Sequence, residues 1–155
     1  MITIDTGRED MDLYKEGEFS WYSVSLDFKE EMEELAKKKG LSVSGNVYGT
    51  GHPQDNGAYW DANVTLEDEN GGIRLNVQYE METKYGPGGI GGTDLLLIKG
   101  NIFGKKIKIR ETKYNADFHI VAKLLEPYFE ANKNDILIEI AELQKQIDDL
   151  KKLIG

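Results

Sequence analysis

The sequence predicts an α+β fold, in which an antiparallel β-sheet packs against one short helix and a long C-terminal helix that ends in a coiled-coil-like segment. Three patterns indicate this fold: alternating apolar and polar residues in several segments between 41 and 113, helical spacing over 27–40, and a longer helical pattern from 115 onward. We divide the chain into an acidic N-terminal arm (1–18), an α+β domain (19–131) and a C-terminal coiled-coil-like helix (132–155).

The composition is that of one folded domain with an extension. The 155 residues are 39% hydrophobic and 10% aromatic, which is enough to bury a core. The absence of cysteine excludes disulfides, thiolate catalysis and cysteine-based metal centres. No run of eighteen apolar residues and no signal-like segment is present, so we expect a cytoplasmic protein without a membrane partner.

Charge is distributed unevenly along the chain. The net charge is -9, but residues 84–115 contain seven basic and two acidic residues. An acidic body of this kind favours a basic or nucleic-acid-binding protein as its partner over direct contact with nucleic acid. The alternative is that the acidity only keeps the protein soluble.

Residues 21–48 predict a strand, a helix and a second strand. "WYSVSLDF" (21–28) alternates with the period of a half-buried strand. Asp27 then serves as the N-cap of a helix that carries acids in its first turns, three lysines in its last turn and Gly40 at its C-cap. "LSVSGNVY" (41–48) resumes the alternation, with Gly45 as a bulge or a close contact.

A hairpin is predicted around "ENGG" (69–72). Two alternating segments flank this Asn-Gly pair, which favours a tight turn. A turn centred on Asn70 and Gly71 pairs residues whose numbers sum to 141, so that Trp60 faces Met81 and Leu66 faces Leu75. The two apolar faces then coincide, which favours this register over a slipped one.

The same register creates a candidate acidic interaction face. Asp61 lies opposite Glu80, Glu82 lies beside Tyr59, and Glu67 lies opposite Arg74. Facing carboxylates destabilise a sheet by roughly 0.2–1 kcal/mol unless they are solvated or meet a cation. One interpretation is a carboxylate dyad with one raised pKa. The other is a solvated strand face, and we assign no catalytic, cofactor-binding or metal-binding residue.

Three further features carry weaker signals. "KYGPGGIGGTD" (84–94) predicts a mobile loop between strands, with the glycines at 86–92, because the lysine and hydroxyl spacing of a phosphate-binding loop is missing. His52 and Asp55 fit a plain loop better than a metal or acid–base site. "KKIKIR" places Lys106, Lys108 and Arg110 on one strand face, a basic strip. The strip either contacts phosphate, protects an edge strand, or pairs with the protein's own carboxylates or with a second copy of the chain, and we favour self-association over nucleic acid.

The C-terminal region predicts two helical segments. Residues 115–135 carry a core-facing apolar stripe, with Pro127 as a kink or break and His119 on the helix flank. Beyond them, apolar residues recur at spacings of four, three, four, three and four: Ile136, Ile140, Leu143, Ile147, Leu150 and Ile154. These twenty residues resemble a short leucine zipper, which implies a parallel homodimer and no activity. The alternative is an amphipathic helix that packs on its own sheet.

Together these features predict a non-enzymatic, self-associating protein whose acidic face binds a basic protein. A phage or mobile-element inhibitor that acts as a decoy for a nucleic-acid-binding machine, such as a host defence system, would have these properties. One alternative is a structural component that oligomerises through the C-terminal helix, and another is a small enzyme that binds a ligand or metal. No cofactor is expected.

Overall fold

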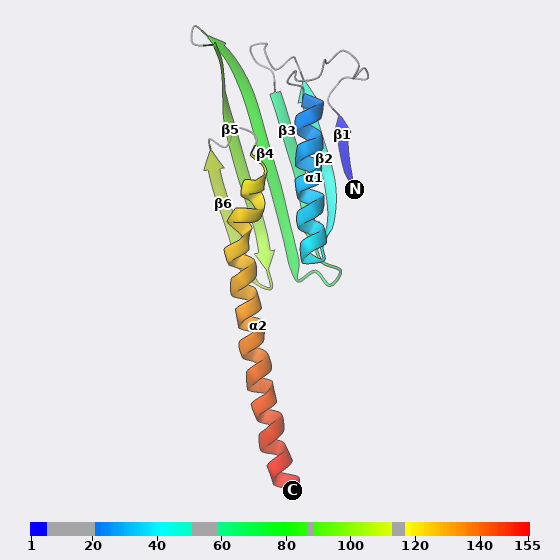
Figure 1. The fold of residues 1–155 in the computed structure, drawn as a ribbon, viewed down its shortest axis with the longest axis vertical. Coiled ribbons are helices and arrows are strands. Elements are labelled where there is room, and N and C mark those ends of the chain that lie inside the picture. Colours follow the sequence, from blue (N-terminus) through cyan, green and yellow to red (C-terminus); the bar gives the residue numbers. More distant parts are fainter. Residues whose placement is uncertain (6–20, 51–58, 87–88, 113–116) are drawn as a thin grey trace. The chain divides into compact units, whose positions relative to one another are not determined.

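The computed structural model describes residues 1–5, 21–50, 59–86, 89–112 and 117–155, and the chain has an α+β fold with two compact units. The first unit, Met1–Ile120, contains a six-stranded sheet and a helix, and the second, Val121–Gly155, is helical. Figure 1 shows the order of the elements along the chain.

Each strand of the sheet lies next to its neighbour in the chain, in the order β1-β2-β3-β4-β5-β6. Strands β1 and β2 pair in parallel, and the other four pairings are antiparallel. The strands are β1 (Ile2–Asp5), β2 (Ser42–Thr50), β3 (Tyr59–Glu67), β4 (Ile73–Gly86), β5 (Gly89–Ile102) and β6 (Lys105–Thr112). Strand β1 therefore adds to the sheet a part of the segment that we treated as an arm, whereas residues 6–18 lie outside the described residues.

The predicted hairpin register is confirmed. Trp60 pairs with Met81, Leu66 with Leu75 and Asp61 with Glu80. The turn is longer than the expected tight one. The last hydrogen-bonded residues are Asp68 and Ile73, so residues 69–72 form the loop, and among these only Gly71 has a positive φ, +73°. The register survives because the coincident apolar faces fix it, whatever the turn type.

The predicted strand at residues 21–28 is wrong, since these residues begin helix α1 (Trp21–Lys39). Val24 and Phe28 fit a period of two, but they also continue the helical series Phe28, Met32, Leu35 and Ala36. Leu26, which a strand would bury with them, is 43% exposed. Asp27 is consequently an interior helical residue and not the N-cap.

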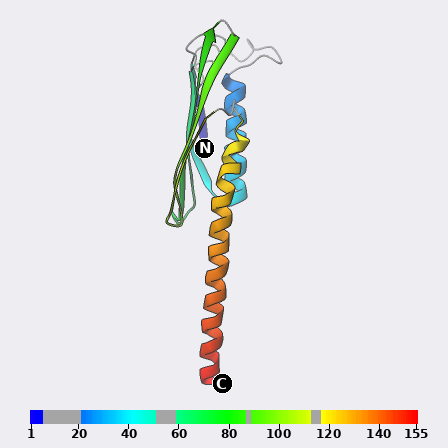
Figure 2. The ribbon, with the colours of Figure 1, turned by 90° about the vertical axis from the view of Figure 1, so that its left-hand side faces the viewer.

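The core lies between α1 and one face of the sheet, as the edge-on view in Figure 2 shows. Phe118 contacts the rings of Phe28, Trp60 and Tyr79, with centroid distances of 5.1, 5.5 and 4.9 Å. The indole Nε1 of Trp60 donates a hydrogen bond to the buried Oγ of Ser25, which ties α1 to β3. The contacts with Phe28 and Tyr79 are edge-to-face and the contact with Trp60 is stacked, and ring contacts of either kind add about 0.5–1.5 kcal/mol each beyond the buried area.

The glycine-rich segment is mostly strand, in contrast to the predicted loop. Strand β4 reaches Gly86 and β5 begins at Gly89, with Thr83 paired to Gly92 and Tyr85 to Ile90. Within the glycine-rich segment, only residues 87–88 lie outside the described part of the chain. Glycine supplies the same backbone donor and acceptor as other residues, so the ladder continues from the flanking strands in spite of the low strand propensity.

Two glycines allow strands to approach closely. A Cβ on Gly45 would lie 2.1 Å from the Asn63 carbonyl oxygen, and one on Gly100 would lie 1.9 Å from the Arg74 carbonyl oxygen. The close contact predicted for Gly45 is therefore confirmed. Beyond Gly100, a two-residue turn at Phe103 and Gly104 joins β5 to β6, and both residues have positive φ.

Helix α2 (His119–Ile154) is continuous for 36 residues and passes through Pro127, so the predicted break is not found. Asp117 stabilises its start, because the carboxylate accepts a hydrogen bond from the His119 backbone N–H at 3.3 Å. Within the second unit, the buried residues are Val121, Leu125 and Phe129, and exposed side chains predominate from residue 130 onward.

Candidate interaction site

The candidate site is the face of the sheet opposite α1, which we call the open face. Within the described part of the first unit, no helix lies on this face. Its side chains alternate with those of the core, so the predicted acidic residues on β3 and β4 project from it together with the basic strip on β6. The structure thus brings together two groups that the sequence analysis treated separately.

The open face is balanced in charge although the whole chain is acidic. Among described side chains it carries five acidic and five basic residues: Asp5, Asp61, Glu67, Glu80, Glu82, Arg74, Lys99, Lys106, Lys108 and Arg110. Glu67 is paired with Arg74 in the register, and so it belongs to a mixed row instead of an acidic one.

The acidic group lies where β3 and β4 approach the glycine-rich segment. Tyr59 hydrogen-bonds to Asp61 through its hydroxyl, and Glu80 and Glu82 lie opposite them. Partial burial raises the pKa of Tyr59 to about 12, and the negative charges of Asp61 and Glu80 contribute. Burial likewise raises the pKa of Asp61, while the hydrogen bond from Tyr59 opposes this shift. The negative charge of Asp61 is therefore held at an energetic cost that a nearby cation would relieve.

The basic group lies on the other half of the face, on β5 and β6. Lys99 pairs with Lys108 and Asn101 pairs with Lys106, and these four residues surround a shallow hollow together with Gly100 and Ile107. Strand β6 is the last strand of the sheet, so the basic strip lies on an edge strand, as one of the interpretations expected. No ion pair joins this group to the acidic group within the described residues.

Amide side chains occupy the centre of the face. Asn76 donates from Nδ2 to Oδ1 of Asn63 at 2.7 Å, and Gln78 pairs with Leu97. Leu95 and Leu97 are half-buried apolar side chains in this otherwise polar surface. Lys99, Leu95 and Leu97 were not predicted as part of the site, because the glycine-rich segment leaves the β4–β5 register undetermined in the sequence.

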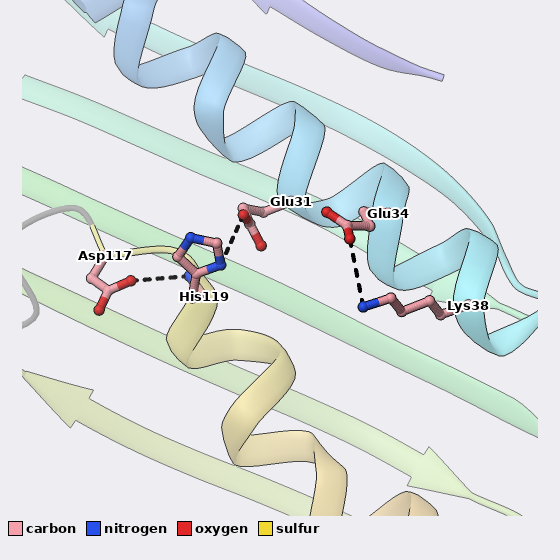
Figure 3. A network of polar contacts seen from close by, with 5 residues as sticks. All are labelled: Glu31, Glu34, Lys38, Asp117 and His119. Atoms are coloured by element: carbon pink, nitrogen blue, oxygen red, sulfur yellow. Dashed lines mark hydrogen bonds and ion pairs between the residues drawn. The ribbon is translucent and has the colours of Figure 1, made fainter.

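A second polar cluster lies at the start of α2 (Figure 3). His119 contacts Glu31 of α1 with 2.9 Å between Nδ1 and Oε1, and a pocket there is lined by Asp27, Glu30, Glu31, Asp117, Phe118 and His119. His119 is 81% exposed, and no hydroxyl or thiol nucleophile lines this pocket. The arrangement is that of a surface contact between a helix and the start of the next one, in line with the flank position predicted for His119.

The predicted oligomerisation residues lie on one exposed stripe of α2. All six side chains are exposed, from 43% for Ile136 to 89% for Ile154. Leu137 and Leu153 are also exposed and widen the stripe. The predicted oligomerisation residues therefore form an exposed apolar stripe within the single chain.

Other candidate sites are not supported by described residues. His52 and Asp55 lie outside the described part of the chain. In the described ranges, no three His, Asp or Glu side chains form a group able to hold a metal ion. No described helix combines the length and apolar character needed to cross a membrane.

Comparison with known proteins gives no assignment. No family model, no curated protein and no solved structure matches the chain.

Proposed function

We propose that the protein is a non-enzymatic interaction module that self-associates through a parallel, two-stranded coiled coil formed by residues 136–154. The observation that carries this proposal is the exposed stripe of six Ile and Leu residues with heptad spacing on a continuous helix. Burial of one such side chain stabilises an association by up to about 1.5–3 kcal/mol, so the stripe supplies a substantial driving force.

The residues beside the stripe support the parallel arrangement. Ile occupies the a positions and Leu the d positions of two heptads, a combination that favours two parallel strands. In such a dimer Glu139 lies near Gln144 of the other copy, and Gln146 near its Lys151. No like-charge pair therefore opposes the association at these flanking positions.

Sedimentation equilibrium on the full chain tests this proposal. At low micromolar concentration and elevated salt, we expect a dimer for the parent protein and about a 100-fold weaker association for Ile147→Asp, because a carboxylate would enter the apolar seam. Lys145→Asp introduces the same residue on the outer surface of the helix and is expected to leave the dimer intact. A monomeric parent, or an unchanged dimer of Ile147→Asp, would contradict the proposal.

A basic protein is the second candidate partner, and the acidic group around Asp61 and Glu80 supports it. In this proposal, a decoy function would place the carboxylates where the partner normally binds phosphate. Fluorescence anisotropy with a labelled arginine-rich peptide as the probe tests it. Binding that is lost in the Asp61→Asn, Glu80→Gln double variant would support this candidate, and equal binding by the variant would exclude the acidic group as its site.

A further inference from the structure

Among its described residues, the open face contains two unfavourable cross-strand pairs of like charge, one acidic and one basic. Asp61 lies directly opposite Glu80, and Lys99 lies directly opposite Lys108. Like charges in directly opposite positions destabilise a sheet. Because the two pairs are on the same face, a single docking event is able to relieve both.

The position midway between the two pairs is occupied by Gln78 and Leu97. Glu80 is two residues from Gln78 on β4, and Lys99 is two residues from Leu97 on β5. The acidic and lysine pairs are therefore about 13 Å apart along the strands and about 10 Å apart across them. Consider an axis that lies in the plane of the face, passes through this midpoint and is perpendicular to the line joining the two pairs. Rotation by 180° about this axis exchanges the positions of the acidic pair and the lysine pair.

We propose that the open face binds the open face of a second copy of this chain around that two-fold axis. The acidic pair of each copy then lies on the lysine pair of the other, so that the contact is made twice. Leu95 and Leu97 of both copies lie near the axis, where an interface is normally most apolar. Among the described side chains, the equal numbers of acidic and basic residues on the face fit an identical partner better than a strongly basic one.

The size of the face sets the strength of this contact. Strands β2 to β6 span about 20 Å across and about 27 Å along their length, or roughly 500 Å² per copy. The total of about 1,000 Å² is at the lower limit for specific protein interfaces, so the association is weak and reversible. Since opposite charges supply much of it, raising the salt concentration weakens it.

This interface lies within residues 1–120 and does not depend on the proposed coiled coil. The two contacts together join coiled-coil dimers into larger assemblies. To separate the two proposals, the experiment uses the full chain carrying Ile147→Asp, which leaves the open face as the remaining self-interface. If the Ile147→Asp protein has the same molecular mass in solution as the parent, the coiled-coil proposal fails. The charge-exchange variants described next still test the open face in that case.

The test is a charge exchange followed by sedimentation velocity over a range of concentrations. One variant carries Asp61→Lys and Glu80→Lys, and the other carries Lys99→Glu and Lys108→Glu. Each variant has two patches of one sign, so each is expected to self-associate at least about tenfold more weakly than the unsubstituted open face. An equimolar mixture is expected to recover the lost association, because each positive patch meets a negative one.

A matched control carries Glu33→Lys and Glu34→Lys on the exposed side of α1, which changes the net charge as much as the acidic-pair variant but leaves the open face intact. This control is expected to associate like the unsubstituted face, and urea unfolding verifies that every variant is folded. Failure of the mixture to recover association, or equal weakening by the α1 control, would overturn the proposal. The proposal would also be overturned if the Ile147→Asp protein, with its open face unsubstituted, did not self-associate at about 1 mM.

Discussion

Substitution of Gly100 by alanine tests the close packing of β4 against β5. A Cβ at this position would lie 1.9 Å from the Arg74 carbonyl oxygen and 2.9 Å from the Leu75 Cα. Strand β4 cannot move away without disturbing β3, to which it is paired along nine residues. The φ of +150° is also one that alanine rarely adopts.

The two effects give the magnitude. Overpacking costs about 1–3 kcal/mol and the strained backbone about 1–3 kcal/mol, so Gly100→Ala is expected to destabilise the protein by about 2–6 kcal/mol. Gly71→Ala is the matched control, because its φ is +73° but no atom lies within 4 Å of a Cβ there. The control is expected to lose only about 1–2 kcal/mol.

Urea unfolding of the parent and the two variants measures this difference. The free energy of unfolding in water is obtained by linear extrapolation, and unchanged m-values would show that the same structure unfolds. We expect Gly100→Ala to be less stable than Gly71→Ala by at least about 1 kcal/mol. Equal stabilities would refute the argument that the backbone of β4 fills the space beside Gly100.

Three further predictions concern the open face and the core. Asp61→Asn is expected to stabilise the protein by about 0.2–1 kcal/mol near neutral pH, because it removes a partly buried charge that also lies opposite Glu80. Because burial raises the pKa of Asp61, the folded protein loses stability as pH rises from the ordinary carboxyl pKa through the raised one. The stability gained by Asp61→Asn should therefore vanish in acid, and urea unfolding at several pH values measures this change. Tyr59 is expected to ionise at about pH 12 instead of 10.0, so the stability that its neutral phenol contributes is present below pH 10.0 and lost as pH rises to about 12. The difference between the spectrophotometric titrations of the parent and of Tyr59→Phe isolates this one phenol among eight tyrosines, and a difference centred near pH 10.0 would contradict the prediction. Phe118→Ala is expected to destabilise the protein by about 3–5 kcal/mol in urea unfolding, because the ring contacts three aromatic neighbours. Phe103→Ala is the control, and it should lower the free energy of unfolding much less because Phe103 is 54% exposed.

The sequence predicts the sheet better than it predicts the start of α1. The β3–β4 register follows from two apolar faces that must coincide, and this constraint holds even though the turn is longer than expected. Residues 21–28 carry too few apolar positions to distinguish a period of two from one of 3.6. Packing of Val24 and Phe28 in the core decides between the two, and a local pattern does not contain that information.

The candidate site is predicted only in part, for a related reason. The acidic pair and the basic strip each follow from the alternation within their own strands. Their presence on one face depends on the β4–β5 register, and the glycines that begin β5 have no side chains from which to read it. The like-charge pair of Lys99 and Lys108 depends on the next register along, which the turn at Phe103 and Gly104 sets.

The sequential order of the strands has a consequence for how the chain folds. From β2 to β6 each strand pairs with the next one in the chain, so hairpins can form one after another through short loop closures. Strand β1 is different, because Ile2 pairs with Gly45 across the whole of α1. The closure entropy of that connection makes β1 the strand that we expect to join last and to open first, which places the earliest amide exchange of the sheet at residues 2–5.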